Sequence, residues 1–335
     1  MIVTVTIPIY RATNKVYRLL DSLQMQSYKD FSIMFVYKKW PGLNGIIAKI
    51  KDYDNLDIDI VKQDDGRVEE ALNTIYRKAD GDIVINTDDD AYVSKNWVKE
   101  HVALHKKHAK IGIATGQVNE NILQNGEKLP FFKKVINETK WRMNKHTIID
   151  KPINQSFRVY GMYIGKSGML VDTGKKYNMM KTFKQHGVNM SWKNEALHDF
   201  KLPGYTVSGG GYEAAAALET IKRKYDAIWF NQSLVFHPLH TSLSRRESIH
   251  KLPVELTAER VLFAYYTQMF GGFTIDLKTL ALRNKIDRLI ASAISPSAEK
   301  GYKIGYELTR SAIMENWPPH KVRKELIKRV GKEST

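Results

Sequence analysis

Cysteine is absent from the 335 residues of this sequence. The absence excludes disulfide bonds, thiolate-bound metal and a cysteine nucleophile, so a bound metal must have carboxylate, histidine or water ligands. No uninterrupted run of about 18 apolar residues occurs, which argues against a membrane-spanning helix. Met1 is followed directly by a β-branched run, which predicts a first strand over residues 1–8 instead of a signal peptide. We expect a cytoplasmic protein, with a peripheral position on the inner face of a membrane as the further expectation.

Acidic residues are the scarcer charge, with 36 Asp and Glu against 52 Lys and Arg and a net charge of +16. The excess is confined to residues 126–187, with a net +9, and residues 241–335, with a net +7. Residues 1–125 and 188–240 are each neutral. Two basic regions suit an anionic partner such as phosphate, lipid head groups or nucleic acid, although the charge alone is better explained by a solvated lysine-rich surface.

Strand and helix patterns alternate through the first 118 residues. The expected strands are 1–8, 31–37, 58–61, 82–86 and 112–118, and the expected helices are 15–26, 46–51, 68–79 and 96–107. Alternation in units of this size predicts an α/β fold with a doubly wound, mostly parallel sheet. Ligand-binding groups of such a sheet lie at the carboxyl ends of its strands.

The rest of the chain is first irregular and then helical. After short strands near 157–164, the pattern predicts a helix near 192–199, a helix over 213–224 and a strand over 227–236, and then helices over 253–269, 277–293, 302–316 and 320–330. We therefore expect one domain over residues 1–240 and a helical, basic region over residues 241–335. The domain divides into a first half (1–118), a basic excursion (119–187) and a second half (188–240).

Three adjacent carboxylates, Asp88, Asp89 and Asp90, follow the apolar strand Ile83–Asn86. In an extended segment, side chains two apart point the same way, so Asp88 and Asp90 can converge on one divalent cation while Asp89 turns aside. Oxygen ligands without thiolate favour a hard ion, Mg²⁺ or Mn²⁺. A turn that caps the next helix is the alternative, but repulsion within a triplet is better explained by a metal.

Four ordered segments resemble family 2 glycosyltransferases of the GT-A fold. They are VTVTIPIY at 3–10 with LDSLQMQSY at 20–28, ADGDIVINTDDD at 79–90, GVNMSWKNEAL at 187–197, and GGYE at 210–213 with the helix and strand that lead to His237. The similarity covers roughly residues 1–240. It implies a GT-A (Rossmann-like) fold and a hexosyltransferase-type, nucleotide-sugar-dependent enzyme whose DxD motif binds Mn²⁺ or Mg²⁺ and the donor diphosphate.

The resemblance assigns roles to individual residues. Asp88 and Asp90 are the expected metal ligands, with Asp88 and Asp89 also at the donor. His237 is the expected third ligand, although a lone histidine after a strand is more often structural. Glu213 takes the place of the catalytic base, and a helix N-terminus keeps a glutamate ionised for that task; a plain N-terminal helix glutamate fits the position equally. His240 and Ser244–Arg246 are weaker candidates for metal and diphosphate contacts.

On the donor side, Pro8 and Tyr10 resemble the start of the family's nucleotide pocket. The chain departs from the family where the second strand ends, because Lys38 stands near the place of an aspartate that contacts the base. A lysine cannot accept a hydrogen bond from an imide N–H, which puts uridine in doubt. Asp65 and Arg67 are the expected donor-pocket residues.

The leading hypothesis is a metal-dependent, inverting glycosyltransferase that acts on a nucleotide-diphosphate sugar and a glycan or lipid-linked acceptor. The alternatives are a retaining GT-A enzyme, an inactive binding scaffold and a nucleic-acid-binding protein. Nucleic acid is not expected, since the predicted catalytic residues fall in charge-neutral stretches. The apolar run 262–266 and the basic helix 320–330 predict membrane contact through residues 241–335, with packing of those aromatics onto the catalytic domain or a second subunit as the alternative.

Overall fold

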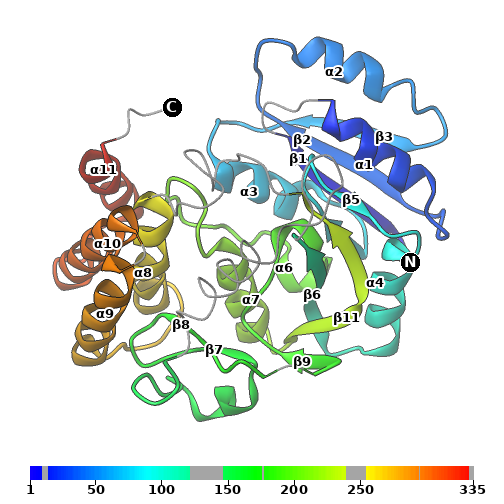
Figure 1. The fold of residues 1–335 in the computed structure, drawn as a ribbon. Helices are drawn as coiled ribbons and strands as arrows, with labels where there is room; N and C mark the ends of the chain where they lie inside the picture. Colours follow the sequence, from blue (N-terminus) through cyan, green and yellow to red (C-terminus); the bar gives the residue numbers. More distant parts are fainter. Residues whose placement is uncertain (10–13, 121–145, 176, 239–253, 294, 332–335) are drawn as a thin grey trace. The chain divides into compact units, whose positions relative to one another are not determined.

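The computed structural model describes residues 1–9, 14–120, 146–175, 177–238, 254–293 and 295–331 (Figure 1). The chain forms two compact units. The sheet unit consists of Met1–Lys128, Tyr177–Leu202 and Ala216–Leu239, and the helical unit consists of Leu129–Lys176, Pro203–Ala215 and His240–Thr335. The domain boundary predicted at residue 240 stays a prediction.

A nine-stranded sheet is the framework of the sheet unit, with the order β3-β2-β1-β4-β10-β6-β11-β5 and with β9 paired to β11. The strands are β1 (Val3–Ile9), β2 (Ser32–Tyr37), β3 (Asp57–Lys62), β4 (Ile83–Asn86), β5 (Tyr92–Val93), β6 (Ile111–Asn119), β9 (Met179–Lys181), β10 (Met190–Lys193) and β11 (Asp226–Phe236). Strands β1 to β4 pair in parallel, as do β6 and β11. This mostly parallel α/β sheet confirms the predicted fold class.

Helices surround this sheet (Figure 1): α1 (Lys15–Gln24), α2 (Leu43–Ile50), α3 (Val68–Lys78), α4 (Trp97–Lys107), α6 (Asn194–Leu197) and the 3₁₀ helix η2 (Gly187–Asn189). Every strand and helix predicted in the first 118 residues is present, with ends shifted by three residues at most. The success has a simple cause, seen in α1, which buries Val16, Leu19, Leu20 and Leu23 at helical spacing.

The prediction of a helix near 192–199 is wrong in its first part. Met190–Lys193 form strand β10, which lies between β4 and β6 and pairs antiparallel to both. Its side chains from Met190 to Trp192 are buried. A strand covered on both faces shows no polar alternation, so its short apolar pattern does not distinguish it from a helix.

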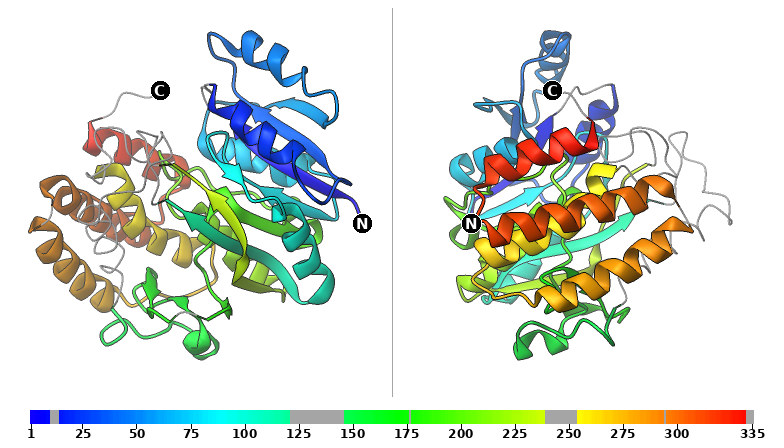
Figure 2. Two further views of the ribbon diagram at one scale, coloured as in Figure 1. Left: turned by 45° about the vertical axis from the view of Figure 1, so that its right-hand side comes forward. Right: turned by 90° about the vertical axis from the view of Figure 1, so that its left-hand side faces the viewer.

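The helical unit contains α8 (Val254–Met269), α9 (Leu277–Ser292), α10 (Pro296–Met314) and α11 (Pro319–Val330), with α10 packed against the other three (Figure 2). It also contains the 3₁₀ helix η1 (Gln155–Val159) and the hairpin β7 (Met162–Ile164)–β8 (Leu170–Asp172). The predicted short strands near 157–164 are thus half right. Helix α10 begins earlier than expected because Pro296 occupies its first turn, where a missing N–H is tolerated.

The apolar run 262–266 is buried within the helical unit. Leu262, Phe263, Ala264, Tyr265 and Tyr266 are at most 2% exposed. The prediction that these five side chains contact a membrane is therefore wrong. Packing of this run on the catalytic domain or a second subunit stays a prediction, as does membrane contact elsewhere in residues 241–335, including the basic helix 320–330. No helix in the described part of the chain is both long enough and apolar enough to cross a membrane.

Candidate active site

The predicted donor and metal residues follow the carboxyl ends of neighbouring parallel strands. Strand β1 ends at Ile9, β2 at Tyr37, β3 at Lys62 and β4 at Asn86. Since these ends share one edge of the sheet, the segments after them lie along that edge. Pro8 is half-buried in β1, opposite Val36 of β2. Tyr10 lies outside the described residues.

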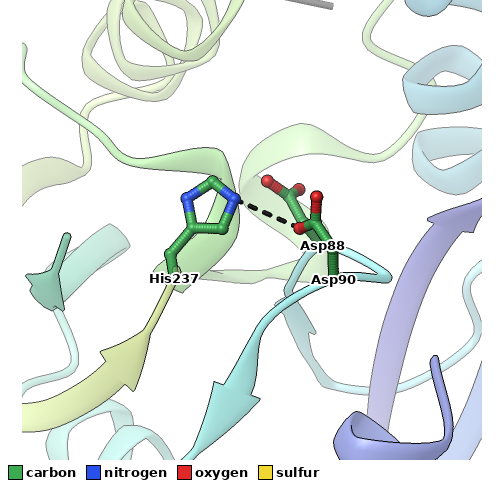
Figure 3. Close-up of side chains that lie close together, drawn as sticks. All are labelled: Asp88, Asp90 and His237. Atoms are coloured by element: carbon green, nitrogen blue, oxygen red, sulfur yellow. Dashed lines mark hydrogen bonds and ion pairs between the residues drawn. The ribbon is translucent and has the colours of Figure 1, made fainter. Parts of the chain in front are cut away.

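Asp88, Asp90 and His237 form a cluster at this edge (Figure 3). One ligand atom from each side chain lies within 4.8 Å of the others. His237 Nε2 lies 3.1 Å from Asp90 Oδ1, and the two side chains are 17% and 18% exposed. The structure therefore brings together the three residues expected to bind metal.

The strand register explains how residues 147 positions apart meet. Strands β5 and β11 pair antiparallel, with Tyr92 opposite Phe236, so the residue after β11 lies beside the residues before β5. The backbone N–H of His237 also donates to Asn119 O at 3.1 Å. Two strands thus hold His237 against the acidic loop.

Asn86 fixes the other side of this loop. Its side-chain oxygen accepts from Thr6 Oγ1 at 2.9 Å, and its Nδ2 donates to Gly187 O at 2.7 Å. Thr87 N donates to Thr6 O at 3.1 Å. These bonds attach the segment before Asp88 to β1 and η2 and limit its movement.

The cluster is electrostatically negative. Burial lowers the pKa of His237, but the hydrogen bond to Asp90 and the charges of Asp88, Asp90 and Glu120 raise it further, so the net shift is upward. An imidazole whose proton is stabilised by three carboxylates occupies a place where a cation is favoured. A divalent ion would satisfy the same carboxylates. Asp89 is not part of the cluster, in agreement with the predicted alternation of side chains.

Asp65 and Arg67 lie in the turn between β3 and α3. The Asp65 carboxylate accepts from the backbone N–H of Arg67 at 2.8 Å and from Arg67 Nε at 2.7 Å. The Lys38 side chain lies against Gly66 of this turn, where a Cβ would collide with it. Lys38, noted for its unexpected place after β2, and the two predicted donor residues therefore lie together after β2 and β3.

Glu213 lies in the first turn of α7 (Tyr212–Lys222), is half-buried and belongs to the helical unit. Tyr212 is 1% exposed and forms an edge-to-face contact with Tyr205, at a centroid distance of 6.1 Å. Tyr205 also contacts Tyr265 and Tyr266. Aromatic packing accounts for Tyr212. The roles predicted for Glu213 and the donor residues stay predictions.

Sequence reasoning missed Glu259, a fully buried carboxylate on α8. Its Oε1 accepts from the backbone N–H groups of Val207 and Ser208 at 2.6 and 2.8 Å, and its Oε2 accepts from Ser208 Oγ at 2.6 Å and Gly210 N at 2.8 Å. Burial raises the pKa of Glu259, against these hydrogen bonds, which lower it. Glu259 thereby organises the glycine-rich turn that leads into Glu213. The sequence signal was a glutamate shortly before the apolar run of α8.

A second missed feature is a buried polar network beneath β10. The Asn189 side-chain oxygen accepts from Trp97 Nε1 at 2.8 Å and lies 2.9 Å from His101 Nε2. Ser191 Oγ lies 2.7 Å from His101 Nδ1 and 2.9 Å from His105 Nε2. Burial lowers the pKa of His101 to about 4 and that of His105 to about 3. Histidines four apart on α4 were the available signal.

His240 and Ser244–Arg246, the weaker candidates for ligand contacts, lie outside the described residues.

Residues 4–163 match the family model described as Glycosyl transferase family 2. This region is a family 2 glycosyltransferase domain. The match confirms the family that the four sequence segments indicated and the assignment to glycosyltransferases. No curated protein matches the sequence.

Solved structures of GT-A glycosyltransferases share the fold over 98% of this chain. Mannosyltransferase PcManGT from Pyrobaculum calidifontis, in complex with GDP-Man and Mn²⁺, has 15% identity, a TM-score of 0.51 and 86% of its chain covered. S. aureus TarS 1-349, in complex with UDP-GlcNAc, has 13% identity, a TM-score of 0.53 and 89% covered. GalNAc-T7 with UDP, GalNAc and Mn²⁺ has 11% identity, a TM-score of 0.52 and 56% covered. At such identities the likeness concerns the fold.

Proposed function

We propose that this chain is a metal-dependent, inverting glycosyltransferase that transfers a sugar from a nucleotide-diphosphate donor to a hydroxyl of a glycan or lipid-linked acceptor. The observation that carries the proposal is the cluster of Asp88, Asp90 and His237 at the carboxyl edge of a family 2 sheet. Neighbours of the same fold hold GDP-Man with Mn²⁺ or UDP-GlcNAc, which supports the donor class.

The cluster fits Mn²⁺ or Mg²⁺ in chemistry and nearly in geometry. Two carboxylates and one imidazole suit a hard or borderline ion. Ligands bonded at about 2.1 Å to one ion lie at most about 4.2 Å apart. The ligand atoms of this cluster lie within 4.8 Å of one another, so a contraction of under about 1 Å completes the set. The hydrogen bond between His237 and Asp90 is the contact that ion binding would replace.

In this mechanism Asp88, Asp90 and His237 hold the ion, which when bound supplies positive charge to the diphosphate leaving group. Glu213, ionised at the start of α7, accepts the proton of the acceptor hydroxyl as its oxygen attacks the anomeric carbon. The bond to the diphosphate breaks on the opposite face, so an α-linked donor gives a β-linked product. Asp65 and Arg67, with Lys38 beside them, bind the donor in this proposal.

Donor hydrolysis in the presence of Mn²⁺ tests the proposal. GDP-mannose and UDP-N-acetylglucosamine are the first donors, and chelation should abolish the activity. Asp90→Asn removes one anionic ligand and should lower the rate at least 100-fold. Asp82→Asn is the matched control, because it removes the same charge at the amino end of β4, where the Asp82 side chain is 62% exposed. Equal losses in both variants would refute the assignment of the metal site.

The anomeric configuration of the product, measured by NMR, distinguishes the inverting mechanism from the retaining alternative. An α product from an α donor contradicts the inverting mechanism and the role of Glu213 as base. Absence of turnover with every donor, together with intact Mn²⁺ and nucleotide binding, supports the inactive scaffold instead.

A further inference from the structure

Helix α9 has its polar side buried and much of its apolar side exposed. Its buried residues are Leu280, Arg283, Asn284, Asp287 and Ala291, of which three are polar or charged. Helices of soluble proteins normally place the apolar stripe inward. The reversal means that the outer face of α9 is suited to something other than water.

The inward polar groups have partners inside the helical unit. Arg283 NH1 lies 2.7 Å from Asp150 Oδ2, and Arg283 NH2 donates to Leu170 O at 2.7 Å. Asp287 Oδ1 lies 2.6 Å from His146 Nε2. These buried polar contacts attach α9 to the region of the β7–β8 hairpin and fix which side of the helix faces outward.

The outer face combines leucines with lysines. Leu282 and Leu289, two turns apart, are 49% and 65% exposed, and Ile290 is 38% exposed. Lys278 and Lys285 are exposed and lie four positions before each leucine, so they occupy the same stripe. The only acid within α9 is Asp287, which is buried. Figure 2 shows α9 at the edge of the row of C-terminal helices, where α10 covers its inner side.

A cavity of about 600 Å³ adjoins this stripe, lined by residues of α9 and α10. Lys285 provides a cationic group and Leu289 provides an apolar wall, while Arg288 forms an ion pair with Glu299, which also lines the cavity. Asn284 is 4% exposed, and its Oδ1 has no hydrogen-bond partner among the described residues. A buried acceptor beside the Lys285 ammonium suits a ligand that carries both a phosphate and a donor group, as a phospholipid head group does.

We propose that the outer face of α9 docks on an anionic lipid bilayer. Leu282, Leu289 and Ile290 enter the head-group boundary, and Lys278 and Lys285 contact lipid phosphates. A second copy of this chain fits less well, because a two-fold contact along the stripe would bring both lysines of each copy into one interface, and α9 exposes no acid to compensate their charge. The α9 stripe, and not the buried run 262–266, is then the membrane contact. Only the presence of a lipid-linked acceptor in that membrane rests on the proposed function.

Co-sedimentation of the full chain with vesicles tests the proposal. Vesicles of phosphatidylcholine with 30% phosphatidylglycerol should bind the protein, and binding should weaken as salt rises. Lys278→Gln with Lys285→Gln should reduce the partition coefficient by roughly fivefold per lysine. Lys324→Gln with Lys328→Gln on α11 is the control, since it removes two exposed lysines, four positions apart, from another helix. Its binding should fall by no more than twofold.

Leu282→Gln with Leu289→Gln should lower vesicle binding at least tenfold while the thermal unfolding midpoint stays unchanged, since neither side chain is buried. No binding by the unaltered chain, or equal losses in the α11 control, overturns the proposal. A dimer in light scattering that disappears in the leucine variant, without lipid binding, assigns the face to a second copy instead. Metal-dependent donor hydrolysis, measured in the same variants without vesicles, reports on the proposed function separately.

Discussion

Glutamine in place of Glu259 changes one buried atom at the centre of the turn before α7. The carboxylate accepts four hydrogen bonds, two on each oxygen. In the least costly orientation the amide oxygen of Gln replaces Oε1 and keeps the N–H groups of Val207 and Ser208. The amide NH₂ then faces Gly210 N–H, which is another donor, while the Ser208 hydroxyl can rotate to accept.

The magnitude follows from these contacts. The variant loses one hydrogen bond to a charged group, a contribution of about 1.5–3 kcal/mol, and leaves Gly210 N–H without an acceptor at a cost of about 1–3 kcal/mol. Glutamine avoids the cost of burying a charge, which offsets part of this loss. We expect the free energy of unfolding to fall by about 2–4 kcal/mol and the midpoint of thermal unfolding by about 3–6 °C.

The turn carries Glu213 in its continuation, so we also expect an effect on the rate. A displacement of about 1 Å at a reacting group lowers a rate by about 100-fold. The turnover number for sugar transfer should therefore fall 10- to 100-fold in Glu259→Gln, while Mn²⁺ binding to the Asp88–Asp90–His237 cluster is unchanged. Glu307→Gln, at a 47% exposed carboxylate paired with Arg329, is the control and should change stability by less than about 0.5 kcal/mol.

Calorimetry and single-turnover transfer below the unfolding temperature measure the two effects. A variant that melts and turns over like the unaltered chain would show that the four hydrogen bonds neither stabilise nor position the turn. Reduced stability with full turnover would restrict Glu259 to a structural role.

Three further predictions concern other parts of the molecule. Burial lowers the pKa of His101 to about 4, against an ordinary value of about 6.5, so the unfolded state binds more protons than the folded state between these pH values. Acidification from pH 6.5 to 4 should therefore lower the free energy of unfolding by about 3 kcal/mol, measured by urea titration at each pH. His101→Gln should weaken this dependence of stability on pH. The pKa of His237 is raised, so this side chain is protonated at a higher pH than an ordinary histidine, and Mn²⁺ must displace that proton. The Mn²⁺ affinity in calorimetric titration should therefore already fall as the pH decreases towards 6.5. His237→Ala should remove this pH dependence of the affinity. Gly211 has a φ of +91° and its added Cβ would lie 3.0 Å from Phe263, so Gly211→Ala should destabilise the fold by about 1–3 kcal/mol in a thermal melt, whereas Gly272→Ala, also at positive φ but with open space, should cost less.

Local patterns carried much of the prediction. The first strands and helices were predicted because each has a complete apolar face within a few residues, as in α1. The metal residues Asp88 and Asp90 could be singled out because a triplet of carboxylates after a buried strand has few structural explanations. Strand β5, with two residues, and the inserted strand β10 carry too little pattern to be predicted.

The contacts that complete the sites join residues that are far apart in the sequence. His237 reaches Asp90 across 147 positions through the pairing of β5 and β11. Glu259 reaches the turn before Glu213 from 49 to 52 positions away. Sequence periodicity does not predict such contacts, because a hydrogen bond between distant segments appears in the sequence only as a single polar residue in each segment.

The sequence by itself determined the α/β alternation, the family and the acidic motif, because these depend on the order and spacing of residues along one segment. Only the tertiary structure decided which side of a helix is covered. The run 262–266 is apolar, which suggested a membrane contact, but its side chains are buried. In α9, Arg283 and Asp287 face inward to Asp150 and His146, and Leu282 and Leu289 are left exposed. Exposure depends on the partners that packing supplies, and those partners come from elsewhere in the chain.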